Sequence, residues 1–186
     1  MDAGVSFHIS CTTFRTCGFS ALTCEQTSEG WHPINFFVSN IGFEEGWAEY
    51  AARLSLDSWG LDPDMMEVIF LDQEFSYLLM GLSDIGINYG GWTVDDVYDL
   101  WETYFYLDSA EDVRDVYDAC MAEPGTILSY SIGYYQICDL EEEVKEMLGE
   151  SFDHNEFVTE LLSVGGASFD ITRSYIMEWA NEKLHG

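Results

Sequence analysis

The sequence has very few basic residues: six Lys or Arg stand against 35 Asp or Glu, which gives a formal net charge of −29 at pH 7. A surface this acidic repels phosphate backbones and anionic lipid, so the charge excludes direct nucleic-acid binding and polybasic membrane docking. No run of about 18 apolar residues occurs, which excludes a membrane-spanning helix. The first residues, MDAGVSFHISCTTF, lack the basic start and apolar core of a signal peptide, so the default expectation is a cytoplasmic location.

Familiar catalytic motifs are also missing. The sequence contains no HExxH, GxSxG, P-loop or GxGxxG pattern, and none of its four histidines lies four residues from another. The five cysteines include no CxxC pair, which argues against a zinc knuckle and favours ordinary reduced thiols. Any catalytic or binding site must therefore be sought in residue patterns other than these motifs.

The spacing of apolar residues predicts an all-α fold, an orthogonal array of about seven helices without a strand. Hydrophobic residues make up 47% of the chain, which is enough to build a core. Residues 1–32 show no period and are expected to be an irregular or poorly ordered segment, followed by a helical domain over 33–186. The expected helices cover residues 34–58, 62–89, 93–105, 109–121, 124–148, 153–164 and 170–184.

The first of these helices carries its apolar residues on one stripe, formed by Phe43, Trp47, Tyr50 and Leu54. Glycine inside a helix costs about 1 kcal/mol relative to alanine, so Gly42 and Gly46 predict that another element approaches this backbone closely. Residues 127–137 are nearly all apolar or small, which predicts the most buried helix. The acidic run 141–143 is expected to face solvent.

Three segments contain the candidate functional residues. In FEEGWAEY (43–50), Glu45 precedes a glycine on a partly apolar helix face, where its carboxylate either faces solvent or reaches a metal at short range. In DIGINYGGW (84–92), Asn88 and Tyr89 lie at a glycine-rich helix end, which is either a capping turn or the wall of a cleft.

The third segment, EPGTILSYSIGYY (123–135), places Tyr130 and Tyr134 one helical turn apart on the same face. Phenols in that position can donate hydrogen bonds to an oxyanion in a dry cleft. The alternative interpretation is two core tyrosines whose hydroxyls are satisfied within the fold.

Taken in order, these segments resemble the C-terminal part of the bacterial family of domain of unknown function 885. The resemblance covers about residues 33–184 and rests on four collinear runs. These are EGWAEY (45–50), DIGINYGGWT (84–93), EPGTILSYSIGYYQI (123–137) and LGESFDHNEFVTELLSVGGASFDITRSYIMEWA (148–180).

That family resembles helical zinc metallopeptidases of the gluzincin type, whose intact members carry an HExxPGH motif shortly before the EGWA run. The resemblance implies zinc as the cofactor, a peptide as the substrate and Glu45 as the third metal ligand. It further implies that Tyr130 or Tyr134 steadies the tetrahedral intermediate, and that Asn88 and Tyr89 lie near the substrate cleft.

The chain departs from the family where the metal motif should lie. Residues 8–31 contain no pair of histidines at ligand spacing, and Ala52 replaces a glutamate that usually closes the EGWA run. One carboxylate cannot hold zinc, so we expect an inactive fragment without bound metal, from a truncated or shifted reading frame. The alternative is a non-catalytic helical module that binds a peptide or protein, with an exposed apolar face that promotes self-association.

Overall fold

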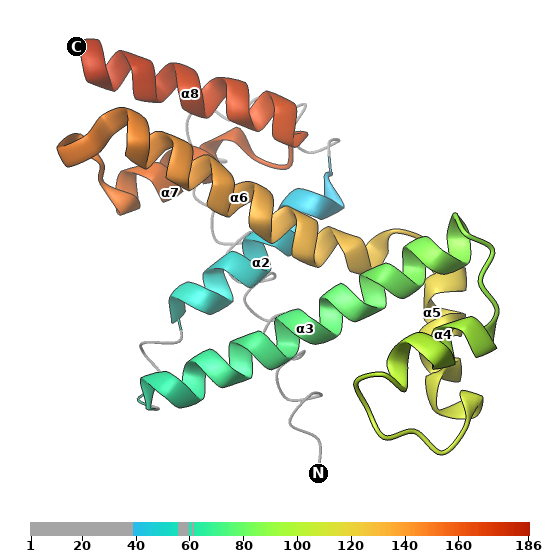
Figure 1. The fold of residues 1–186 in the computed structure, drawn as a ribbon. Helices are drawn as coiled ribbons and strands as arrows, with labels where there is room; N and C mark the ends of the chain where they lie inside the picture. The colour runs from blue at the N-terminus through green and yellow to red at the C-terminus, as the bar shows by residue number, and fades with distance from the viewer. Residues whose placement is uncertain (1–38, 56–59, 61) are drawn as a thin grey trace. The chain divides into compact units, whose positions relative to one another are not determined.

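The computed structural model describes residues 39–55, 60 and 62–186, and within them the chain forms seven α-helices and no strand. This confirms the expected all-α fold, while the predicted irregular segment 1–32 lies outside the described residues. None of the described helices is long and apolar enough to cross a membrane. The helices are α2 (Ile41–Ser55), α3 (Pro63–Asn88), α4 (Val94–Trp101), α5 (Arg114–Ala122), α6 (Thr126–Leu148), α7 (His154–Val164) and α8 (Phe169–His185) (Figure 1).

Polar caps begin several of these helices, as the sequence predicts. At the start of α4 the Asp96 carboxylate accepts a hydrogen bond from the Thr93 amide at 2.7 Å. A second capping box, at Ser109, opens a short 3-10 turn, η3 (Ala110–Val113), ahead of α5. The expected start of α6 at Pro124 is wrong by two residues, because Gly125 adopts a left-handed conformation (φ 80°) before the helix begins.

The chain divides into two compact units, the first formed by Met1–Ser55 with Ile132–Gly186 and the second by Leu56–Ser131. In the first unit, α2, α6, α7 and α8 share one core. Its fully or nearly buried apolar side chains are Phe43, Trp47, Tyr50, Ile137, Leu140, Val144, Leu148, Phe157, Leu161, Leu162, Ile176 and Ala180. Three of the four residues of the predicted α2 stripe belong to this core, whereas Leu54 is 46% exposed in the last turn of α2.

Glycines bring α2 and α6 into direct backbone contact. A Cβ atom added at Gly46 would lie 2.2 Å from the carbonyl carbon of Gly133, and one added at Gly133 would lie 2.0 Å from the carbonyl oxygen of Gly42. Carbon atoms do not approach so closely, so glycine is required on both helices. The predicted close approach at α2 is thereby confirmed, and its partner is α6.

The structure corrects the expectation that residues 127–137 form the most buried helix. Ile132 and Tyr135 in that run are 50% and 40% exposed, whereas eight of the 15 residues of α2 are buried. Apolar content overestimates burial here because α6 contributes one face to the core and leaves the other uncovered.

In the second unit, α3 packs against α4 and α5. Its small core contains Ile87, Val97, Val113 and Cys120, with the Trp92 ring covering it. A Cβ atom at Gly86 would lie 2.1 Å from that ring, so the last turns of α3 fit beneath Trp92 only because they carry glycine there.

We predict that Gly46→Ala lowers the free energy of unfolding by roughly 1–3 kcal/mol, because the added methyl group must push α2 away from α6. Gly42→Ala is the matched control, since its Cβ would meet only side chains, the nearest being Asn40 Oδ1 at 3.2 Å. It should change stability by less than about 1 kcal/mol. Urea unfolding followed by circular dichroism measures both variants, and equal stabilities would contradict the backbone contact.

Candidate functional site

The candidate metal ligand Glu45 is buried on α2. It is 3% exposed, and Glu49, one turn further along, is 5% exposed. Neither carboxylate is therefore a solvated helix face, which removes the solvent-facing interpretation for both. Burying carboxylates is costly unless they are paired, so this part of α2 is built around polar interactions.

The contact between α2 and α6 places Glu45 and Tyr134 on adjoining stretches of backbone. Glu45 directly precedes Gly46, and Tyr134 directly follows Gly133. Tyr134 is half-buried and packs on the edge of the first unit's core, with its ring 5.3 Å from that of Tyr135. The first unit thus combines a buried carboxylate and a phenol at one helix crossing.

The other predicted site residues belong to the second unit. Tyr130 lies one turn before Tyr134 on α6, and its ring packs 5.2 Å from the ring of Tyr77 on α3. Tyr89 caps α3 and is 93% exposed.

Asn88 has hydrogen-bond partners inside the second unit. Its amide donates to Asp84 Oδ1 at 2.7 Å and to the carbonyl of Cys120 at 3.0 Å, which ties the end of α3 to α5. Asp84 is 2% exposed, and its other oxygen accepts from the amide of Gly125 at 2.7 Å. This network holds three segments of the unit together, so Asn88 has a structural role whatever else it contacts.

We predict that Asn88→Ala lowers the free energy of unfolding by about 1–3 kcal/mol, because it leaves buried acceptors without a donor. Asn181→Ala, at an exposed position on α8, should change it by less than about 0.5 kcal/mol. The measurement is denaturant unfolding of both variants. Unchanged stability of Asn88→Ala would mean that the network contributes nothing to the fold.

A second polar cluster in the first unit was missed by the sequence analysis. Glu141 on α6 is only 9% exposed, contrary to the expected solvated face, and its carboxylate lies 2.8 Å from His154 Nδ1 and 2.9 Å from Lys145 Nζ. The ring of Tyr50 stacks on that of His154 with centroids 6.3 Å apart. Two signals could have revealed Glu141: Lys145 follows it at i+4, and it shares a helix face with Ile137.

The residues of this cluster shift one another's pKa values. Burial opposes ionisation of Glu141, but contacts with Lys145, His154 and Tyr50 outweigh it and leave the pKa of Glu141 below its usual range. Burial, and then the Glu141 carboxylate, raise the pKa of Tyr50. At neutral pH the cluster therefore holds a carboxylate beside a neutral phenol.

Because the pKa of Glu141 is lowered on folding, its contribution to stability is present above the unfolded value of about 4.3 and is lost as the pH falls through the folded value. We predict that Glu141→Gln costs about 1–3 kcal/mol at pH 7 and that its difference from the wild type shrinks towards pH 3. The exposed neighbour Glu142 provides the control variant Glu142→Gln. Urea unfolding over this pH range tests both, and a pH-independent difference would contradict the assignment.

Cys120 and Cys138, the cysteines among the described residues, are free thiols. Burial raises the pKa of Cys120 to about 11 and also raises that of Cys138.

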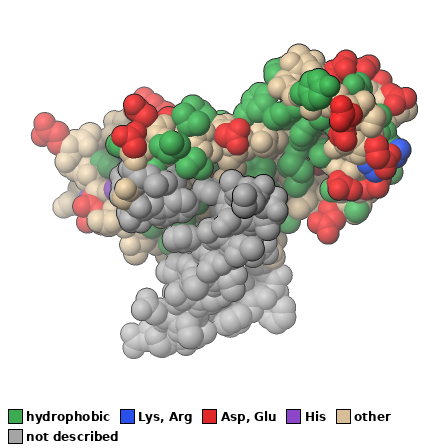
Figure 2. All heavy atoms as spheres, turned by 90° about the horizontal axis from the view of Figure 1, so that it is seen from below, with side chains coloured by type: hydrophobic (Ala, Val, Ile, Leu, Met, Phe, Trp, Pro, Cys, Tyr) green, Lys and Arg blue, Asp and Glu red, His purple; other side chains and the backbone are tan. Residues whose placement is uncertain are grey.

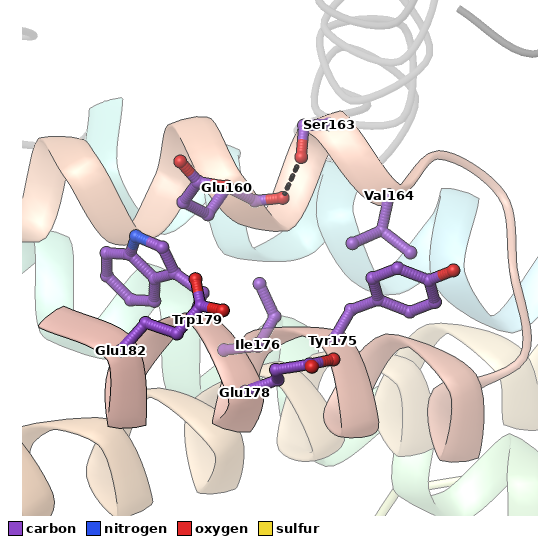
Figure 3. A pocket seen from close by; sticks show the side chains of 8 residues that line it. All are labelled: Glu160, Ser163, Val164, Tyr175, Ile176, Glu178, Trp179 and Glu182. Carbon is purple, nitrogen blue, oxygen red and sulfur yellow. Dashed lines mark hydrogen bonds between the residues drawn. The ribbon is translucent and has the colours of Figure 1, made fainter.

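A surface pocket of about 220 Å³ lies between α7 and α8 in the first unit (Figure 3). It is lined by Glu160, Ser163, Val164, Tyr175, Ile176, Glu178, Trp179 and Glu182. Three carboxylates beside two aromatic rings would suit a cationic group, but Lys183 Nζ already lies 5.6 Å from the Trp179 ring. The pocket is smaller than usual ligand sites of about 300–1,000 Å³ and includes none of the predicted site residues.

Among residues 39–55, 60 and 62–186, no group of three or more His, Cys, Asp or Glu side chains is arranged to hold a metal ion. A catalytic zinc ion needs three protein ligands. The described part of the chain therefore does not fit zinc as a complete site, and Glu45 is at most a single ligand.

The sequence also matches a known bacterial protein family. Residues 21–176 match the family described as "Bacterial protein of unknown function (DUF885)". The chain belongs to this family, as its sequence runs predicted. The match begins at residue 21 rather than 33, so the expectation that residues 21–31 are unlike the family is wrong.

A solved structure also shares the fold. It is described as a "putative lipoprotein" from Colwellia psychrerythraea and aligns with a TM-score of 0.65 and 24% sequence identity over 76% of this chain. The present chain spans only 24% of the length of that protein chain. No curated protein matches the sequence.

Proposed function

We propose that this chain provides the C-terminal helical part of a zinc-metallopeptidase scaffold, in which Glu45 supplies one ligand to the metal. The observation that supports the proposal is the burial of Glu45, 3% exposed, at a helix crossing formed by glycine backbones. A metal ligand must be held to within a fraction of an ångström, and a close-packed helix pair provides such rigidity.

The remaining ligands are assigned to the two histidines of the HExxPGH motif that the family resemblance implies. This chain has no such motif in residues 8–31, so the proposal gives it an incomplete metal site and no peptidase activity of its own. Membership of the family is consistent with a shared scaffold, and the catalytic assignment rests on the resemblance.

Within the same proposal, Tyr134 is the stronger candidate of the two tyrosines to donate a hydrogen bond to a tetrahedral oxyanion. It directly follows the glycine that touches α2 and therefore lies near Glu45 along the helix crossing. A phenol held in a partly dry environment stabilises developing negative charge more strongly than one in water. Tyr130 is the alternative candidate for this role. It lies one turn earlier, on a part of α6 that belongs to the second unit.

The test uses a full-length relative that carries HExxPGH. Changing the glutamate aligned with Glu45 to Gln should lower its zinc content several-fold and abolish peptide cleavage, because the third ligand is lost. The matched control is the residue aligned with Glu44, which here accepts a hydrogen bond from Ser39 at 2.6 Å. Its change to Gln should leave zinc content and cleavage near the wild-type values.

The chain itself should bind less than one zinc per molecule by elemental analysis and should cleave no peptide. Tight binding of one zinc per chain, abolished by Glu45→Ala, would show that the site is complete and would contradict the proposed fragment. Unchanged zinc in the altered relative would contradict the ligand assignment.

A further inference from the structure

Helix α3 carries an apolar stripe whose side chains are exposed in the part of the chain that the structure describes. The stripe consists of Val68, Leu71, Phe75, Leu78, Leu82 and Ile85. Each of these side chains is between 39% and 62% exposed. A row of large exposed apolar side chains on one helix is unusual on a free surface and is typical of an interaction site.

The stripe has the spacing of a coiled-coil seam. Its residues follow one another at alternating intervals of three and four positions, the a and d positions of a heptad repeat. At 1.5 Å per residue it extends for about 26 Å along the helix. This spacing specifies the shape of the partner, because a and d side chains pack best into the grooves of a second α-helix.

The second unit uses the adjoining e and f positions of α3 for its own core. Leu79, Gly86 and Ile87 are buried there, and the Trp92 ring lies against Gly86. Only Phe75 in the stripe has ring contacts, with Tyr104 and Phe105 at 5.2 and 6.1 Å. The stripe therefore borders the face that holds the unit together, and its own side chains stay between 39% and 62% exposed.

The charge around the stripe selects the chemistry of that partner helix. Helix α3 contains no basic residue, and Asp72 occupies an e position directly beside the seam. The whole segment 56–131 holds 17 acidic residues and a single basic one, Arg114. Figure 2 shows hydrophobic side chains lying next to acidic ones on the face it displays. A second copy of this chain would bring like charges together, whereas Lys or Arg at flanking positions would be attracted.

We propose that the stripe on α3 is a docking site for a basic amphipathic α-helix of another protein. The apolar seam provides the contact area, and the acidic surroundings select positive flanking residues and speed the encounter. The inference is independent of the zinc assignment, because it concerns the second unit and involves no metal ligand.

The experiment measures binding of synthetic four-heptad peptides to the full chain by fluorescence anisotropy at low and moderate salt. One peptide has Leu at a and d and Lys at e and g, and the second has Glu at e and g instead. The Lys peptide should bind at least tenfold more tightly, and its affinity should fall as salt rises.

The double variant Leu71→Gln with Leu82→Gln should weaken binding of the Lys peptide by at least tenfold while leaving the helical signal unchanged. The matched control is Ile171→Gln with Leu184→Gln on α8, whose side chains are 50% and 48% exposed compared with 50% and 53% for the stripe pair. The control should bind as the wild type does.

Three results would overturn the proposal. They are equal binding of both peptides, failure of the Lys peptide to bind at 100 µM, and binding that the stripe variant does not weaken. A stable dimer in sedimentation that the stripe variant dissociates would likewise overturn it, because the occupant would then be a second copy.

Discussion

Helices α2 and α6 contact each other directly through backbone atoms, and the first unit is organised around that contact. Gly46 on α2 and Gly133 on α6 approach so closely that neither position has room for a methyl group. The contact draws the two helices together, so that Phe43, Trp47 and Tyr50 enter the same core as Ile137, Leu140 and Val144. It also buries Glu45 and Glu49, whose burial would be unfavourable without a structural or functional reason.

Local signals in the sequence predicted local structure well. The helical segments expected to start at residues 93, 109 and 153 do start there, because the side chains of Thr93, Ser109 and Asp153 cap them through hydrogen bonds that reach no more than three residues along the chain. Gly46 predicted a close approach for a similar reason, because the free-energy cost of a glycine inside a helix can be judged from the sequence alone. Its partner Gly133 could not be deduced, because 87 positions separate the two and nothing in either neighbourhood specifies the pairing.

The same lack of information on long-range contacts explains why neither the burial of Glu141 nor the exposed stripe on α3 was predicted from the sequence. Glu141 was expected in water because it belongs to an acidic run, and its burial depends on His154, which another helix brings to it. Helix α3 is apolar on more than one side, so its sequence alone does not say that Leu79 is buried while Leu78 and Leu82 are exposed. The burial of Glu45 could not be predicted from the sequence, because it depends on helices that are distant along the chain. The roles assigned to Tyr130 and Tyr134 rest on the family resemblance.

One of the two boundaries between the units, at Ser131 and Ile132, falls inside helix α6 rather than in a loop. Compact units are usually joined by flexible linkers, where insertion and exchange are tolerated. A non-helical insertion here would interrupt the helix and leave backbone donors and acceptors on both sides without partners. Relatives are therefore expected to carry insertions in loops rather than at this position in α6.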